Sequence, residues 1–241
     1  MGGSIPLFRF AGIQVSLHFS WFLAAAYFLN SGRQLYARPI FAVYEYLGLF
    51  MIILLHEFGH AFACRSVGGS ADRILLWPFG GVAFVRPPSR PGAQLWSIAA
   101  GPLVNVALIP ILKLLRLSLW NSGSADLYQL VAMISAINVW ILLFNLLPVY
   151  PLDGGQILRS LLWYPFGRIK SLRIASVLGL IGAAAFILWA FQQRSLWIGL
   201  LAFFLMTQAL NGWRQAKLLQ QQEDENARVP PPVDAPRPPV L

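Results

Sequence analysis

The stretch from residue 54 to residue 61 reads Leu54-Leu55-His56-Glu57-Phe58-Gly59-His60-Ala61. Two histidines four residues apart lie about one turn apart on the same face of a helix, so both imidazoles can reach one metal ion. Glu57 follows the first histidine, where its carboxylate can hold and deprotonate a metal-bound water. This His-Glu-x-x-His spacing is typical of zinc hydrolases.

The residues on both sides of this motif are apolar. Glu45 is the only charged residue between Phe41 and Leu55, and the apolar run continues after the motif as far as Arg65. A motif with three fixed positions also arises by chance. Ionisable groups inside a membrane helix, however, are costly and are functional by default. The setting therefore favours a zinc site within a membrane over a pair of structural core histidines.

The composition indicates a polytopic membrane protein. The chain has 241 residues, of which 57% are hydrophobic and 11% charged, whereas soluble domains are about 25% charged. Its net charge of +9 does not indicate a nucleic-acid partner, because the basic residues form no patch with interleaved aromatic residues. They lie between apolar segments, where they face the headgroups of a lipid bilayer. The single cysteine, Cys64, excludes an intrachain disulfide.

The N-terminal residues 1–16 are predicted to form a β-hairpin. Residues 5–16 alternate loosely between apolar and polar and break at Ala11-Gly12, which is typical of two short strands. The first apolar segment, Leu17–Leu29, follows. It also fits the apolar core of a signal peptide, but the histidine at its entry, His18, favours a retained helix.

A second hairpin is predicted between Ile74 and Val85. This apolar stretch of twelve residues is shorter than the ~20 residues that a spanning helix needs. Its centre, residues 78–81 (Pro-Phe-Gly-Gly), has the residues typical of a turn. A hairpin that enters the membrane requires protein or a cavity to satisfy its backbone.

The predicted fold is an all-α polytopic membrane protein with six transmembrane helices and a small β-sheet. The sheet combines the N-terminal strands with the membrane re-entrant hairpin. The six spans lie in one domain, 17–213, with core spans at 40–156, followed by a disordered, proline-rich cytoplasmic tail at 214–241. Beyond the first segment, the predicted spans are Ile40–Ser66, Ala93–Leu117, Leu127–Leu147, Ile174–Phe191 and Leu196–Trp213.

The charges of the connections predict the orientation of these spans. With six spans, 13 of the 18 lysines and arginines fall on one side, and by the positive-inside rule that side, with both termini, is cytoplasmic. The five on the other side are Arg33, Arg38, Lys113, Arg116 and Arg194. His56 and His60 then lie toward the cytoplasmic end of their span.

Asp153 is the predicted third metal ligand. It follows the fourth span, in a stretch that Pro148, Pro151, Gly154 and Gly155 unwind. This places it at the same depth as the two histidines, where Glu57 is the only other acidic residue. A catalytic zinc needs three protein ligands and an open position. Without the depth argument, an ordinary turn or capping aspartate would be the favoured interpretation.

Several polar residues of the spans remain open to two interpretations. Asn105 and Asn145 either donate to a reaction oxyanion or hold helices together, and Asn138 shares a face with Asn145. The pair Gly80 and Gly81 fits the turn of the second predicted hairpin. His18 is interpreted as a polar contact between spans or to the hairpin, ahead of a direct role.

These motifs resemble the site-2 protease family of intramembrane zinc metalloproteases, in the branch without a PDZ insertion. The matching stretches are His56–His60, the Gly-Pro-Leu-Val-Asn stretch 101–105, and residues 145–155 with their Pro-Leu-Asp-Gly-Gly core. The resemblance covers about residues 17–156. It implies one Zn²⁺ per chain on His56, His60 and Asp153, with Glu57 as the general base.

The resemblance also implies a function. It implies a zinc metalloendopeptidase that hydrolyses peptide bonds within or near the transmembrane segments of single-span membrane proteins (regulated intramembrane proteolysis). The hairpin near Gly80 and Gly81 would present the substrate as an added strand. The expected location is a bacterial or archaeal cell membrane. Only 28 residues follow Trp213, so the regulatory nucleotide-binding module of many members is not expected.

Two other functions and one structural question stay open. A divalent-metal transporter would use the same side chains as transient ligands, but it predicts polar residues through the full membrane thickness and repeat symmetry. A catalytically inactive membrane-binding protein has no need of an intact Glu57. Association of several copies into a homo-oligomer is left open.

Overall fold

The computed structural model describes residues 3–22, 25–26, 35–77, 80–120 and 123–228. Its elements, in chain order, are β1 (Ser4–Phe10), β2 (Ile13–His18), α2 (Ile40–Ser66), β3 (Ser70–Trp77), β4 (Gly80–Arg86), α3 (Pro91–Ser118), α4 (Ala125–Asn145), α5 (Asp153–Gln193) and α6 (Leu196–Arg228).

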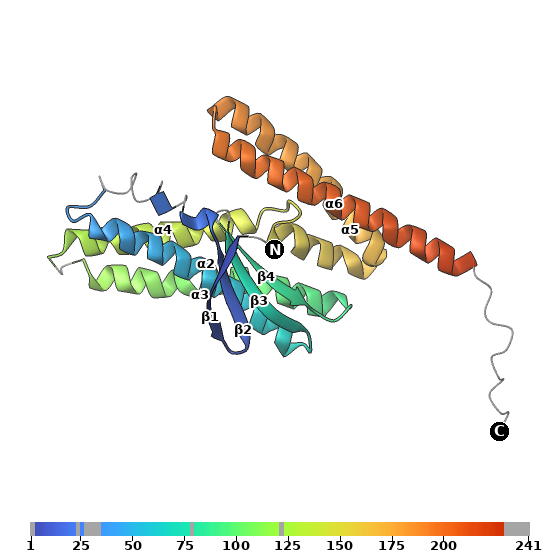
Figure 1. Ribbon diagram of the computed structural model, residues 1–241, viewed down its shortest axis with the longest axis horizontal. Coiled ribbons are helices and arrows are strands. Elements are labelled where there is room, and N and C mark those ends of the chain that lie inside the picture. The colour runs from blue at the N-terminus through green and yellow to red at the C-terminus, as the bar shows by residue number, and fades with distance from the viewer. Residues whose placement is uncertain (1–2, 23–24, 27–34, 78–79, 121–122, 229–241) are drawn as a thin grey trace, which may run out of the picture.

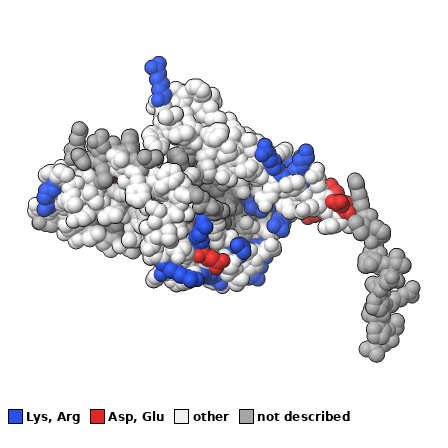
Figure 2. Space-filling model, viewed as in Figure 1, with Lys and Arg blue, Asp and Glu red and all other residues white. Residues whose placement is uncertain are grey.

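The molecule is a mostly helical membrane protein with a small sheet (Figure 1). Within the described residues, α2 to α6 are five helices long and apolar enough to cross a membrane. Helices α2, α3 and α4 contact one another, and α5 and α6 form a long hairpin that leans away from them. Charged side chains are sparse on the face seen in Figure 2. The chain is therefore an integral membrane protein.

The predicted count of six spans is not confirmed. Residues 23–24 and 27–29 of the predicted first segment, Leu17–Leu29, lie outside the described residues, and its first two residues, Leu17 and His18, end strand β2. The N-terminal hairpin is present, turning through the positive φ angles of Ala11 and Gly12. It runs two residues further than predicted because Leu17 still pairs with Ile5 of β1.

One four-stranded sheet joins the two predicted hairpins in the order β1-β2-β3-β4. Neighbours β1 and β2 pair antiparallel, β2 and β3 parallel, and β3 and β4 antiparallel. One face of the sheet packs on α2, because apolar residues at alternate positions of β2 and β3, such as Val15, Ile74 and Leu76, are buried with Phe58 and Ala61 of the helix. The sheet is thereby held against the helix that carries the His-Glu-x-x-His motif.

The predicted spans match the helices, with two corrections. Helix α2 has the predicted bounds, and α3 and α4 differ from theirs by only a few residues. Helix α5, however, begins at Asp153, about twenty residues before the predicted fifth span, and is interrupted at Gly167, which has φ 77° and ψ 171°. Gly154 and Gly155, interpreted as turn residues, lie instead in its first turn.

The second correction concerns the tail. Residues 214–241 were predicted to be disordered, but α6 continues to Arg228. The reason is compositional: the segment after Trp213 is rich in Gln, Arg, Leu, Glu and Ala, all good helix formers, and the prolines begin only at Pro230. The prediction for residues 229–241 lies outside the described residues.

Candidate metal centre

The motif residues lie near the cytoplasmic end predicted for α2 and face the interior of the protein. His56, Glu57 and His60 are 4%, 5% and 6% exposed. Gly59 lets α3 approach this part of α2 closely, because a Cβ at Gly59 would come within 2.8 Å of the Ala100 carbonyl oxygen. The helix therefore buries the two imidazoles against α3, and it buries Glu57 against strand β4.

Asp153 reaches the same place from the first turn of α5. The chain between α4 and α5 folds back tightly: the N–H of Leu152 bonds the carbonyl of Val149 at 2.8 Å. Gly154 and Gly155 pack directly on the backbone of this connection, where any Cβ would overlap with backbone atoms. These glycines let the turn close, and the closed turn directs the Asp153 carboxylate at the two histidines.

The side chains of His56, His60 and Asp153 form a buried cluster that could hold a metal ion. Asp153 Oδ2 lies 3.0 Å from His56 Nε2 and 3.4 Å from His60 Nε2, and the two Nε2 atoms are 3.1 Å apart. Ligand atoms around a tetrahedral zinc at the usual 2.0–2.1 Å lie about 3.3 Å from one another. The three donor atoms thus already occupy one face of such a tetrahedron.

Both imidazoles are held through their other nitrogen. His60 Nδ1 lies 2.9 Å from the backbone carbonyl of Ser97, and His56 Nδ1 bonds Asn105 Oδ1. A carbonyl oxygen only accepts, so His60 Nδ1 carries the proton and its Nε2 presents a lone pair to the cluster. Such partners orient metal-binding histidines in general.

Gly101 of α3 lies directly against the two imidazoles. A Cβ at this position would overlap His60 Nε2 and come within 2.8 Å of His56 Nε2. The Gly101-Pro102 pair was interpreted as a means of close helix packing. The structure places this close contact on the two Nε2 atoms of the cluster, which the sequence pattern alone does not reveal.

Glu57 stands beside the cluster and outside it. Its Oε2 accepts a hydrogen bond of 2.8 Å from the backbone N–H of Ala83 in β4. Gly81, two residues earlier in the same strand, lies so close that a Cβ there would overlap the Glu57 side chain. The carboxylate is therefore fixed between the His56–His60–Asp153 cluster and strand β4.

The remaining predicted site residues fall in different places. Gly80 begins β4 with φ 137°, as expected for a hairpin turn. Asn145 is the last residue of α4, and its side chain has no hydrogen-bond partner among the described residues. Asn105 is fully buried against His56, which favours a role in holding that ring over the oxyanion role. His18 contacts Ser20 and Phe19 and is not in the cluster.

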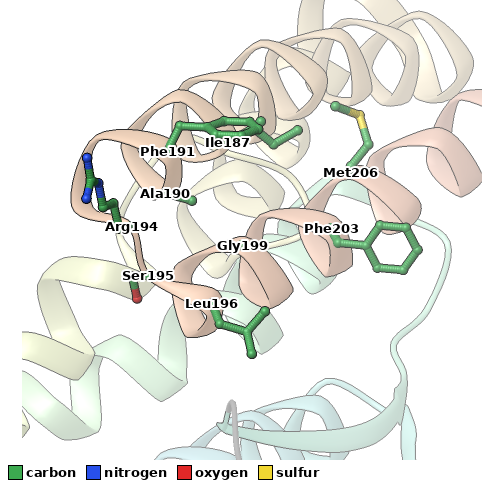
Figure 3. Close-up of a pocket in the computed structure, with 9 residues that line it drawn as sticks. All are labelled: Ile187, Ala190, Phe191, Arg194, Ser195, Leu196, Gly199, Phe203 and Met206. Atoms are coloured by element: carbon green, nitrogen blue, oxygen red, sulfur yellow. The ribbon is translucent and has the colours of Figure 1, made fainter.

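A separate groove lies at the far end of the α5–α6 hairpin (Figure 3). It has a volume of about 480 Å³ and is lined by apolar residues together with Arg194 and Ser195; the apolar set includes Ile187, Phe191, Leu196, Phe203 and Met206. Its lining contains no carboxylate or histidine, the side chains of the predicted zinc site. The buried cluster of His56, His60 and Asp153 is therefore the candidate functional site.

Comparison with known proteins identifies the family. Peptidase family M50 matches residues 44–121 and 108–189, which include the whole cluster. The chain belongs to this family, and the predicted resemblance to site-2 proteases is confirmed.

Relatives of the chain carry consistent names. It is 33% identical over 205 residues to a zinc metalloprotease of Methanocaldococcus jannaschii, covering 85% of this chain and 59% of the relative. It is 30% identical over 254 residues to a putative zinc metalloprotease of Synechocystis sp., covering 95% and 66%. The chain thus spans about six tenths of the length of these curated relatives.

A solved structure shares the fold. The site-2 protease from Methanocaldococcus jannaschii superposes with a TM-score of 0.64 at 29% identity, covering 87% of this chain and 95% of that one. The sheet and helices described above are therefore those of a site-2 protease.

Proposed function

We propose that this chain is an intramembrane zinc metalloprotease that hydrolyses peptide bonds within or near the transmembrane segments of membrane proteins. The observation that carries the proposal is the convergence of His56, His60 and Asp153, with Glu57 beside them, inside helices that are apolar enough to span a membrane. Family membership and the names of the relatives support the same activity.

His56, His60 and Asp153 would hold the zinc ion. Two imidazole nitrogens and one carboxylate oxygen are a usual donor set for catalytic zinc, which leaves a fourth position open. The close approach of Gly101 keeps the side of the cluster toward α3 free of a side chain. When bound, zinc supplies Lewis acidity that activates water at neutral pH and polarises a carbonyl.

Glu57 would act as the general base. Its carboxylate is buried and is not one of the three clustered ligands, so it remains available to take a proton from the attacking water and pass it to the leaving amine. The hydrogen bond from Ala83 holds Oε2 in place and leaves Oε1 for the proton.

Strand β4 would receive the substrate. It is one edge of the sheet, and because Ala83 directs its N–H away from β3, Gly81 and Val85 direct theirs to the same open edge. A transmembrane helix hides its carbonyl groups in its own hydrogen bonds, so it must unwind before hydrolysis. Pairing with β4 would replace the lost bonds and place the extended peptide beside Glu57.

The opposite edge of the sheet is less suited to this task. Strand β1 contains Pro6, which has no N–H, and its pairing with β2 is irregular between Pro6 and Phe8. Proline and bulges are the usual devices that prevent a strand edge from pairing further. This contrast favours β4, with Gly80 and Gly81 at its start, as the substrate strand.

The orientation proposed here rests on the charge pattern, and the location and substrate class rest on the family resemblance. The chain would lie in a bacterial or archaeal cell membrane with both termini in the cytoplasm, and it would cleave single-span proteins in regulated intramembrane proteolysis. Asn145, which ends α4 next to the connection to Asp153, would contact the substrate. Metal transport is not favoured, because the described residues contain one such cluster and no second one along a path.

Co-expression with a panel of single-span membrane proteins tests this function. We expect shortened products that disappear with a cell-permeant zinc chelator and with Glu57→Gln. Cleavage that is unaffected by both treatments would come from another protease and would contradict the proposal.

A further inference from the structure

A hydrogen-bonded chain of two asparagines connects the metal cluster to α4. Asn105 of α3 and Asn138 of α4 are both 0% exposed. His56 Nδ1 bonds Asn105 Oδ1, and Asn105 Nδ2 donates to Asn138 Oδ1 at 2.8 Å. Asn138 Nδ2 in turn donates to the backbone carbonyl of Asn105 at 2.9 Å. Three helices therefore meet in one polar network at His56.

The orientation of both asparagine amides is fixed by the backbone carbonyl of Asn105, which accepts the last hydrogen bond of the network. A backbone carbonyl cannot donate, so the Asn138 amide must direct Nδ2 toward it. Oδ1 of Asn138 then faces Nδ2 of Asn105, and Oδ1 of Asn105 faces His56. Since Asn105 Oδ1 only accepts, the proton of the neutral His56 ring must be on Nδ1.

We propose that Asn138 is a positioning residue of the metal centre, which acts through Asn105 to fix the tautomer and orientation of His56. The inference rests on the proposed zinc function. With the proton on Nδ1, His56 Nε2 presents its lone pair to the cluster. A rotated Asn105 amide would present Nδ2 to Nδ1, and the ring would then carry its proton on Nε2, where it cannot bind metal.

His56 and His60 have the same tautomer, with the proton on Nδ1, but different groups fix it. The proton position of His60 is set directly by the Ser97 carbonyl, which no side-chain substitution removes. His56 depends on a side-chain amide, and an isolated amide can rotate to offer either end. The two bonds between Asn138 and Asn105 prevent the Asn105 amide from rotating. This explains why position 138 is a buried asparagine, although helix packing alone would accept an apolar residue there.

The test is the zinc dissociation constant of the full-length protein, measured by competition with a chromophoric chelator. Asn138→Leu leaves Asn105 Nδ2 without an acceptor and frees the amide to rotate. Loss of a partner that orients a metal ligand weakens metal binding by about 10–100-fold, and we expect a loss in this range. Asn138→Asp has the same shape; as the neutral acid, the form that burial favours, one oxygen accepts from Asn105 Nδ2 and the O–H donates to the Asn105 carbonyl, so this variant should keep an affinity close to that of the unaltered protein.

Two further variants separate positioning from general packing. Ser135→Ala removes a polar side chain of α4 that, within the described residues, donates to the Val131 carbonyl of its own helix, and it should leave zinc affinity unchanged. Because Asn138 acts through Asn105, the double variant Asn105→Leu/Asn138→Leu should bind zinc no more weakly than Asn105→Leu alone. If Asn138→Leu does not accumulate, Asn138→Ser replaces it, since its hydroxyl is too short to bridge Asn105 Nδ2 and the carbonyl.

The outcomes distinguish this inference from the function on which it rests. Unchanged zinc affinity in the Asn138→Leu or Asn138→Ser variant, or losses that add in the double variant, would overturn the role of Asn138 and leave the protease proposal intact. Absence of zinc binding by the unaltered protein would instead contradict the proposed function.

Discussion

The carboxylate of Glu57 is bonded to the backbone N–H of Ala83, at 2.8 Å, on the open edge of strand β4. The proposed general base and the proposed substrate strand are therefore in direct contact. A peptide that pairs with β4 arrives beside the group that must move the proton. Changes in β4 are consequently expected to affect catalysis without removing any residue of the metal cluster.

Replacement of Glu57 by glutamine separates catalysis from metal binding. Glutamine has the same shape and can still accept the Ala83 N–H, so the fold and the zinc content should be retained. General-base assistance is worth about 10²–10⁴-fold, and cleavage of a membrane substrate should fall by that factor. Gel-based cleavage rates together with metal analysis check both parts, and a wild-type rate in this variant would contradict the mechanism.

Gly81→Ala tests the contact between β4 and the base. The added Cβ would overlap the Glu57 side chain and displace its carboxylate, so cleavage should drop by at least about tenfold, since general-base assistance alone contributes 10²–10⁴-fold. Zinc content should not change. Gly199→Ala is the matched control, because a Cβ at Gly199 meets only Ala190 at 4.0 Å; equal activity of the two variants would show that the contact has no catalytic role.

Gly101→Ala is expected to lose zinc, in contrast to Gly81→Ala. A methyl group there would overlap His60 Nε2 and crowd His56 Nε2, so zinc should be lost while the helices remain folded. Measurement of zinc per purified chain, with circular dichroism for helix content, checks this result. Full zinc occupancy in the variant would mean that the imidazoles do not bind metal through their Nε2 atoms.

Accessibility labelling tests the orientation. Tags at both termini should be protected in intact cells, and a reporter inserted between Asn121 and Ala125 should be accessible from outside. The reason is the excess of lysine and arginine in the connections assigned to the cytoplasmic side. Accessible termini would invert the orientation and place the metal cluster toward the outer face.

The central part of the fold was predictable from the sequence because its signals are local. The apolar run of α2 and the spacing of His56 and His60 need no tertiary information, and the bounds of α2 agree with those predicted. Asp153, 93 residues after His60, could be placed only through the order of the spans and their orientation. Its proximity to both histidines in the structure supports that reasoning.

The parts that sequence reasoning missed depend on tertiary contacts. Gly154 and Gly155 were interpreted as a turn, because their contacts with the backbone of the preceding connection are not visible in the sequence. Asn105 was considered as an oxyanion donor, but its orientation is decided by His56 and Asn138 on two other helices. The parallel pairing of β2 with β3 likewise joins strands separated by all of α2.

The most direct measurement of the central claim is X-ray absorption at the zinc edge on the purified Glu57→Gln protein, in which turnover is blocked. Assignment of zinc to His56, His60 and Asp153 predicts one ion per chain, with nitrogen and oxygen neighbours at about 2.0–2.2 Å and the multiple scattering typical of two imidazoles. A sulfur neighbour at about 2.3 Å, for which Cys64 is the one cysteine of this chain, or a protein that retains no zinc, would contradict it.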